Sequence, residues 1–320
     1  MKRRLLLLTF IFGFVIACSK KEESADAPEI KGKIGTTCMD LTNPFFKLIA
    51  NEMTKEAAKY GYEVVALDGA NDSAKQNSQL SDFAAQGYDA VFVNSVDSQS
   101  IGEGVKKVHA AGIPVFSFDN QVLAADAKDL VISHIGSDNF QGGEVAAAAM
   151  MKATGDKGKI AILNLPESSS CILRVDGFKS HLQKNNSKLE IVTELNGKGR
   201  RAESLSVMTD ILQAHPDIVG VFAINDPSAL GAHAAIAKAG RTDDIVIVGF
   251  DASPAGKQAV FEKKLVDTPQ QFPRKMAVGT VEAFIKHLEG EDLEKKIFIP
   301  CEHYDYEASV DDPSREAEQW

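Results

Sequence analysis

A chain of 320 residues is long enough for about two domains, and 44% hydrophobic with 25% charged residues is an ordinary globular composition. This composition excludes a disordered chain, a collagen-like fibre and a small disulfide scaffold. Asp and Glu outnumber Lys and Arg by 45 to 35, which gives a net charge of −10 and disfavours nucleic acid as a partner.

The N-terminus has the parts of a secretory signal peptide. These are basic residues 2–4, the apolar run 5–16, and Val15-Ile16-Ala17 directly before Cys18. The apolar run is too short to span a bilayer of ~30 Å as a helix. The ending Val-Ile-Ala-Cys resembles a bacterial lipobox, which implies that residues 1–17 are removed and that Cys18 is lipidated. We expect residues 18–32 to be a flexible tether that anchors the protein in the periplasm or at the cell surface, at an inner or an outer membrane.

From residue 33 onward, short β-branched runs alternate with amphipathic helical stretches, a pattern typical of parallel sheets flanked by helices. In the first half, strands are predicted at about 33–37, 62–67, 90–93 and 113–118, and helices at about 44–61, 73–87 and before 112. The first helix has clear signals, because Asn43 suits the N-cap, Pro44 the first turn and Gly61 the C-terminal end.

The second half repeats the alternation. Helices are predicted at about 140–153, 172–184, 203–214, 227–239 and 254–263, and strands at about 159–163, 190–194, 218–223, 245–248 and 266–268. A last helix at 273–288 and a last strand at 296–300 are too short for a third core, so they must join an existing lobe. If they return to the first lobe, the chain crosses between lobes three times and forms a hinge that can open and close around a ligand.

This reading gives two similar α/β lobes. The first takes residues 33–137 plus about 272–300, the second takes 138–271 plus about 301–310, and residues 311–320 are expected to be a loose tail.

Polar residues gather at the ends of the predicted strands, where open parallel sheets bind their ligands. The set is Asn43, Asp68, Asn94, Asp119, Asn120, Asn164, Asn225, Asp226 and Asp251. Any one of them fits a helix cap or a turn. Amides and carboxylates from both lobes, together with Arg174, suit a polyol, because each hydroxyl donates to a carboxylate and accepts from an amide or a guanidinium. The C–H faces of a sugar would pack on Phe45 or Phe46, one of which is expected in the core because helical neighbours point about 100° apart.

Catalytic and cofactor motifs are absent from the sequence, which contains no phosphate-binding loop, nucleotide-binding glycine motif, nucleophile elbow, H-E-x-x-H or C-x-x-C. We therefore expect no cofactor, no metal and no catalytic residue. Apart from Cys18, the chain has three cysteines, Cys38, Cys171 and Cys301. A disulfide between any two of them would leave the third thiol free. We expect the three cysteines to be small buried hydrophobic residues, and the sequence leaves open whether any two of them form a disulfide.

Five motifs carry a family resemblance. They are Thr42-Asn43-Pro44-Phe45-Phe46, Ile135-Gly136-Ser137-Asp138-Asn139 with Gly142-Gly143, Arg174-Val175-Asp176-Gly177-Phe178, Ala223-Ile224-Asn225-Asp226, and Val248-Gly249-Phe250-Asp251. In this order, and over about residues 33–300, the chain resembles the periplasmic sugar-binding proteins of the ribose-binding type, which serve ATP-binding-cassette importers. The resemblance implies the type I periplasmic binding protein fold, with two doubly wound parallel-sheet lobes joined by a three-stranded hinge.

The resemblance also implies a sugar site. Its residues are Asn43, Phe45, Phe46 and Asp119 in the first lobe, and Arg174, Asn225, Phe250, Asp251 and Gln271 in the second. Asp119 and Asp251 would accept hydrogen bonds from ring hydroxyls, and Arg174 would donate two parallel hydrogen bonds. Asn225 and Gln271 would make the remaining hydrogen bonds to the sugar, and aromatic rings would pack on both of its faces.

Two positions depart from the ribose-binding pattern. Asn120, which we include among the site residues, stands where those relatives carry an arginine, and residues 197–201 lack their aromatic. A donor and a stacking face are therefore missing, which puts ribose in doubt and leaves room for a larger sugar, a ketose or a sugar alcohol. Arg200 or Arg201 then either enters the pocket or lies in an exposed loop.

The function expected from this reading is a lipid-anchored, monomeric receptor, not an enzyme. It would capture a monosaccharide (a pentose or hexose, including ketoses and sugar alcohols) and deliver it to a membrane permease, with a chemoreceptor as a further possible partner. One alternative is a secreted carbohydrate-acting enzyme that uses Asp119 and Asp251 as its carboxylates. Others are a sugar sensor without a transport role, and a repressor of the same fold, which would need a helix-turn-helix where this chain has a signal peptide and a tether.

Overall fold

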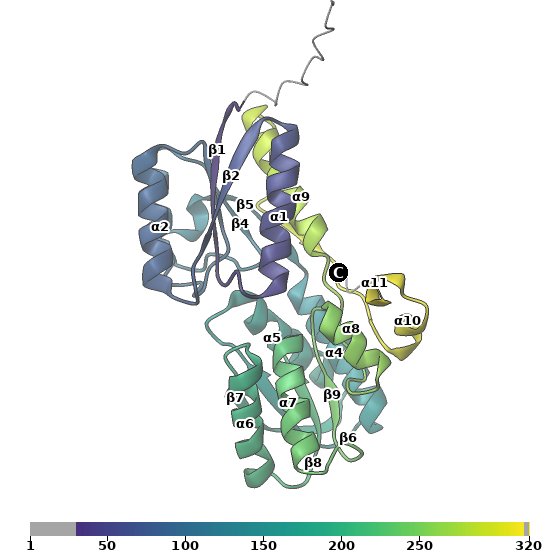
Figure 1. Ribbon diagram of the computed structural model, residues 1–320. Coiled ribbons are helices and arrows are strands. Elements are labelled where there is room, and N and C mark those ends of the chain that lie inside the picture. The colour runs from purple at the N-terminus through teal and green to yellow at the C-terminus, as the bar shows by residue number, and fades with distance from the viewer. Residues whose placement is uncertain (1–29, 317–319) are drawn as a thin grey trace, which may run out of the picture.

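Two parallel α/β lobes lie one above the other in the computed structural model, which describes residues 30–316 and 320 (Figure 1). The first sheet contains β1 (Gly32–Cys38), β2 (Tyr62–Asp68), β3 (Ala90–Val93), β4 (Val115–Phe118), β5 (Val131–Ser137) and β10 (Lys296–Ile299). Its strand order is β10-β5-β4-β3-β1-β2, and all of its pairs are parallel. The predicted fold class is confirmed.

Helices cover both faces of the first sheet. They are α1 (Pro44–Lys59), α2 (Ser73–Gln86), α3 (Gly102–Ala110) and α9 (Pro273–Leu288), with a short 3-10 turn at Lys128–Leu130. Successive strand residues point to opposite faces, so Phe92 and Phe116 pack toward α1 and α9, whereas Val91 and Val115 pack toward α2 and α3. The start of α1 follows the sequence signals, since Asn43 Oδ1 accepts from the Phe45 amide at 3.0 Å.

The second lobe repeats this plan on a smaller sheet. Its strands are β6 (Lys157–Asn164), β7 (Lys188–Asn196), β8 (Ile218–Ala223) and β9 (Val246–Val248), in the parallel order β7-β6-β8-β9. Its helices are α4 (Asn139–Thr154), α5 (Ser169–Lys184), α6 (Arg201–Ala214), α7 (Asp226–Lys238) and α8 (Pro254–Phe261).

Two glycines let α4 and α5 approach closely. A Cβ at Gly143 would lie 2.1 Å from the Arg174 carbonyl oxygen, and a Cβ at Gly177 would lie 1.9 Å from the carbonyl oxygen of Phe140. Both distances are far below any real contact, so only glycine permits this helix packing. The position of α5, and with it the position of Arg174, therefore depends on these two residues.

The chain passes between the lobes after β5, again near residue 271, and a third time after β10. The last crossing exists because β10 pairs with β5 in the first sheet. The crossing segments touch through single bridges, Gln270 with Glu302 and Asp267 with Asp305. The predicted strand at 266–268 is not formed as such, since only Asp267 pairs with the end of β9, at Val248, before the segment turns toward the crossing.

Residues 306–316 pack on the second lobe, although the sequence predicted a loose tail from residue 311 onward. Helices α10 (Tyr306–Val310) and α11 (Pro313–Glu316) lie beside α8 (Figure 1). The Lys257 ammonium is almost fully buried and lies 3.2 Å from Asp312 Oδ2, which also accepts from the Tyr304 hydroxyl at 2.7 Å. A buried cation needs an anionic partner, and Asp312 ties the segment down by supplying one.

The predictions of a signal peptide and a lipidated Cys18 lie outside the described residues. Within residues 30–316, no helix has both the length and the apolar character that a membrane span requires. Cys38, Cys171 and Cys301 are buried free thiols.

Candidate functional site

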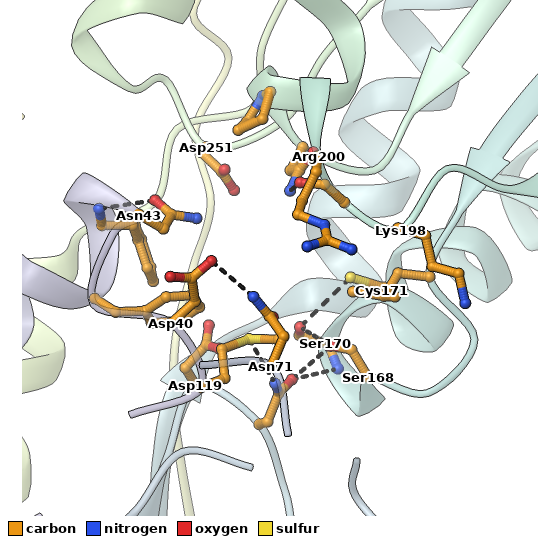
Figure 2. Close-up of a pocket in the computed structure, with 18 of the residues that line it drawn as sticks. Asp40, Asn43, Asn71, Asp119, Ser168, Ser170, Cys171, Lys198, Arg200 and Asp251 are labelled. Carbon is orange, nitrogen blue, oxygen red and sulfur yellow. Dashed lines mark hydrogen bonds between the residues drawn. The ribbon is translucent and has the colours of Figure 1, made fainter. Parts of the chain in front are cut away.

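A cavity of about 270 Å³ lies between the two lobes, at the carboxyl ends of their strands. The residues predicted from the sequence that line it are Asn43, Phe45, Phe46, Asp119 and Asn120 of the first lobe, and Arg174, Asn225, Asp251 and Gln271 of the second. Figure 2 shows Asp119 and Asp251 on opposite sides of this space. The structure therefore brings together all of the predicted site residues except Phe250.

Arg174 is held rigidly on α5 and is 3% exposed. Its Nη1 donates to the Ile224 carbonyl at 2.6 Å and to Asp251 Oδ1 at 3.2 Å, and its Nε donates to Asn139 Oδ1 at 2.8 Å. Among the described residues none accepts from Nη2. Because three fixed bonds orient the guanidinium, Nη2 is the edge that can donate to a ligand in the cavity.

Phe250 corrects one prediction, because its ring supports Arg174 and does not line the cavity. The ring is fully buried, and the guanidinium of Arg174 lies 3.9 Å from its centroid. Gly142 packs against it from α4, where a Cβ would lie 2.5 Å from the Phe250 Cζ. The aromatic face that the sequence assigned to a sugar is thus used in a cation–π contact with the arginine.

Asp119 and Asp251 are buried carboxylates on strained backbone. Their φ angles are 57° and 112°, in the region that residues with side chains seldom adopt. Burial raises the pKa of Asp119 to about 7; Arg174 opposes this rise, and the charge of Asp251 adds to it. Burial likewise raises the pKa of Asp251 to about 6, against the opposing charge of Arg174 and the hydrogen bond from Gln271.

The floor of the cavity offers hydrogen-bond acceptors. Gln271 donates through Nε2 to Asp251 Oδ1 at 2.7 Å, while its Oε1 is buried without a partner in the described part of the chain. Asn94 donates to Asp119 Oδ2 at 2.9 Å, which leaves Oδ1 of Asp119 to accept from elsewhere. An unpaired buried acceptor costs about 1–3 kcal/mol, so Gln271 Oε1 calls for a donor that the cavity contents would supply.

Asn43, Phe45 and Phe46 form the first-lobe wall. The Oδ1 of Asn43 caps α1, so its Nδ2 is the group left for a ligand. The two rings lie edge to face at 5.3 Å, and both are at once part of the hydrophobic core and of the cavity lining. The expected division into one core ring and one site ring is therefore not seen. Trp320 packs against the same wall, 5.1 Å from the Phe45 ring.

Two predicted amides already have protein partners. Asn225 donates to the Gly199 carbonyl at 2.9 Å and accepts from the Ser228 amide at 2.9 Å, so it caps α7 and holds the loop before α6. Asn120 accepts from Ser168 and Ser170 of the second lobe and donates to the Ser95 carbonyl at 2.9 Å. Both residues line the cavity, but with most of their hydrogen-bonding capacity in use.

The sequence reasoning missed Asp40 and Asn71, which stand on the first-lobe rim (Figure 2). Asp40 Oδ2 accepts from Asn71 Nδ2 at 2.8 Å. Burial acts to raise the pKa of Asp40, but hydrogen bonds from Thr42 and Asn71 and the charge of Arg200 together lower it. Each residue closely follows a strand, β1 or β2, so the strand-end rule could have found both.

The opposite rim is basic. Lys198, Arg200 and Arg201 all line the cavity, which answers the question that the sequence left open about the two arginines. Arg200 points from the second lobe toward the space beside Asn71 (Figure 2). Its side chain is 51% exposed and lies 2.9 Å from Glu203 Oε1. Among the described residues, no group of three or more His, Cys, Asp or Glu is placed to hold a metal ion.

Comparison with known proteins gives consistent matches. Residues 34–292 match the family model described as a periplasmic binding protein domain. The chain is 35% identical over 301 residues to the ribose import binding protein of Bacillus subtilis (strain 168), which covers 92% of this chain and 96% of that protein.

Two solved structures are also similar to this chain. An ABC transporter solute binding protein from Bacillus halodurans C-125 with bound myo-inositol superposes with a TM-score of 0.81 at 30% identity, covering 92% of this chain and all of that one. A second, from Agrobacterium vitis with bound D-fucose, gives a TM-score of 0.82 at 28% identity, over 90% of this chain and 100% of that one.

Proposed function

The chain belongs to the periplasmic binding protein family, and on that premise we propose that it is the sugar-binding component of an ATP-binding-cassette importer. The observation that carries this proposal is the cavity between the lobes, where buried acceptors of both lobes face the fixed guanidinium of Arg174. A ligand that bonds to both walls favours the closed arrangement, which is how binding would be passed on to a permease.

The ligand that fits this lining is a small polyol. Asp119, Asp251 and Gln271 each present an acceptor, and a molecule with several hydroxyl donors satisfies all three. Arg174 Nη2 and Asn43 Nδ2 donate to the hydroxyl or ring oxygens, and Phe45 and Phe46 offer apolar surface to C–H groups. We propose a monosaccharide: a pentose or hexose, including ketoses and sugar alcohols.

A binding role is favoured over hydrolysis. The carboxylates that a carbohydrate-acting enzyme would use are Asp119 and Asp251, and both are held by side chains that favour a fixed acceptor geometry. The relatives named above are binding proteins of importers. We further propose that Cys18 is lipidated, that residues 18–32 tether a monomeric body to the membrane, and that a permease is the partner; the support is the lipobox-like Val-Ile-Ala-Cys sequence.

The test is calorimetric titration of the protein with D-ribose, myo-inositol, D-fucose, ketoses and sugar alcohols, after a thermal-shift screen. A ligand at 100 Kd stabilises a protein by about 2.7 kcal/mol, which such a screen detects. We expect at least one micromolar or tighter ligand, and a large loss of affinity in Asp119→Ala and Arg174→Ala.

Matched controls are Asp217→Ala and Arg274→Ala, whose side chains are exposed, lie outside the cavity and pair with Lys159 and Glu52. No binding across the panel by a folded protein contradicts the proposal. Chemical conversion of a bound sugar, abolished by Asp119→Asn, favours the enzyme instead.

A further inference from the structure

The N-terminus of α5 is capped from the opposite lobe. The first helical residue, Ser169, donates its amide to Ser98 Oγ at 3.1 Å, and the second, Ser170, donates its amide to Asn120 Oδ1 at 3.2 Å. Ser98 and Asn120 follow β3 and β4 of the first sheet, whereas α5 belongs to the second lobe. Two amides that every helix leaves unpaired are thus satisfied across the cleft.

Helix α5 also has a serine at its own N-cap position, but the side chain of this serine makes no capping hydrogen bond. Ser168 occupies the N-cap position with extended backbone, where a serine oxygen ordinarily accepts from the second or third helical amide. Here it makes no such bond, and its hydroxyl donates to Asn120 Oδ1 at 2.7 Å. Ser168 therefore has two alternative roles, a local cap and a bond to the other lobe.

Further hydrogen bonds join the two lobes at the same place. The Gln121 amide donates to Ser169 Oγ at 2.7 Å, and the Ser98 amide donates to the Glu167 carbonyl at 3.1 Å. Asn120 itself is held in the first lobe by its bond to the Ser95 carbonyl. Ser98, Asn120, Ser168 and Ser169 are each at most 2% exposed. Separation of the lobes would expose all of these groups to water.

We propose that closure of the lobes replaces the Ser168 cap of α5 with a cap from Asn120 and Ser98, so that Asn120 is a positioning residue for the closed state and not a ligand contact. The proposal rests on the proposed function in one respect, namely that a sugar is what draws the lobes together. Arg174 lies on the same helix, less than two turns beyond Ser168, so capping and the position of the ligand-binding guanidinium are linked.

The consequence for affinity follows from the energy of a cap. Loss of an N-cap costs about 0.5–2 kcal/mol, and each 1.4 kcal/mol is tenfold in an equilibrium constant. Because the Asn120 and Ser98 bonds exist only when the lobes meet, Asn120→Ala and Ser98→Ala should each weaken sugar binding about 2- to 30-fold. Ser168→Ala removes one bond in each state, the local cap when the lobes are apart and the bond to Asn120 when they meet, so it should change sugar affinity much less than Asn120→Ala.

The direct test is amide hydrogen exchange at Ser169 and Ser170, followed by NMR, in the wild-type protein, the double variant Ser98→Ala/Asn120→Ala and the control Ser81→Ala/Asn51→Ala. The control changes the same residue types away from α5: Ser81 bonds the Asn77 carbonyl of its own helix, and Asn51 is exposed on α1. The probe is whichever of D-ribose, myo-inositol and D-fucose binds by calorimetry. We expect the sugar to slow exchange at both amides in wild type and control at least tenfold, and in the double variant much less.

Equal protection by sugar in all three proteins, or a loss of affinity in Ser168→Ala as large as that in Asn120→Ala, overturns the proposal. If no sugar of the panel binds, the proposed function fails but the capping does not depend on that result. The comparison is then made without ligand, where the proposal has Ser168 as the cap of α5: faster exchange at Ser170 and Cys171 in Ser168→Ala than in the control supports the exchange of caps, and equal exchange overturns it.

Discussion

Arg174 Nη1 lies 3.2 Å from Asp251 Oδ1, and the two side chains are only 4% and 7% exposed. A buried ion pair contributes little net stability, because desolvation offsets attraction, but it fixes geometry. Burial raises the pKa of Asp251, and the charge of Arg174 opposes that rise. Arg174 opposes the rise in the pKa of Asp119 as well, from across the cleft.

Removal of Arg174 should affect both stability and binding. Arg174→Ala leaves Asp251 buried without its cation, and breaking one partner of a buried pair costs about 3–5 kcal/mol. We expect the free energy of unfolding, measured with urea, to fall by an amount in this range, and sugar affinity to be lost. Arg274→Ala, which removes an exposed arginine that pairs with Glu52, should change stability by less than about 1 kcal/mol. Wild-type affinity in Arg174→Ala contradicts the assigned donor role.

Sugar binding should strengthen as pH rises from 5 to 8. Burial raises the pKa of Asp119 to about 7 and that of Asp251 to about 6, so both are partly protonated in the middle of this range. Hydroxyl donors favour the ionised carboxylates, so binding should release protons. Calorimetry in two buffers of different ionisation enthalpy measures that release. It should shrink in Asp119→Asn, and uptake of protons instead would contradict the acceptor role.

Stability of the ligand-free protein should show the opposite trend. Burial also raises the pKa of Asp226, to about 7, so this carboxyl and those of Asp119 and Asp251 keep protons in the folded state that they lose in the unfolded state. Between about pH 4 and 7 the folded state therefore binds more protons, and the contribution of these groups to the free energy of unfolding falls as pH rises. Urea unfolding of wild type and Asp119→Asn should converge toward pH 4. A constant difference over this range contradicts the raised pKa.

Asp40 and Arg200 should act together across the mouth of the cavity. They belong to different lobes, and the charge of Arg200 contributes to the lowered pKa of Asp40. Because Arg200 is half exposed, the interaction is worth at most about 1 kcal/mol, or roughly a fivefold change in affinity. Asp40→Asn and Arg200→Gln should each weaken sugar binding to that extent, and the double variant should be no weaker than either. Additive losses would show that the two residues act independently.

Gly177→Ala should displace α5. Its Cβ would lie 1.9 Å from the Phe140 carbonyl oxygen, a backbone atom that cannot move without separating α4 from α5. We expect a destabilisation of about 1–3 kcal/mol and a loss of sugar affinity through Arg174. The control is Gly279→Ala on α9, where a Cβ meets only Ile135 Cγ2 at 3.4 Å, so stability should be kept or slightly raised. Unchanged sugar affinity in Gly177→Ala would show that the packing of α4 against α5 does not determine the position of Arg174 in the site.

Much of the fold could be predicted because it depends on local patterns. The Asn43-Pro44 signal placed the start of α1, and the 273–288 periodicity gave both ends of α9. The packing of residues 311–316 was not predicted, since their polar sequence gives no sign that Asp312 neutralises the buried Lys257. Asp40 and Asn71 were within reach of the strand-end rule and were overlooked.

The loops that meet at the cavity could be identified from the sequence, because alternating strands and helices make parallel sheets, and parallel sheets gather their carboxyl-end loops at one edge. The use of each side chain in those loops depends on contacts that form only in the folded chain. Phe250 lies beneath Arg174, Asn225 holds the Gly199 loop, and Asn120 caps α5, while Asp119, Asp251 and Gln271 keep acceptors that face the cavity. The physical reason is that a polar atom has few hydrogen bonds to make, and its partners come from segments that are distant in sequence and, for Asn120, from the other lobe.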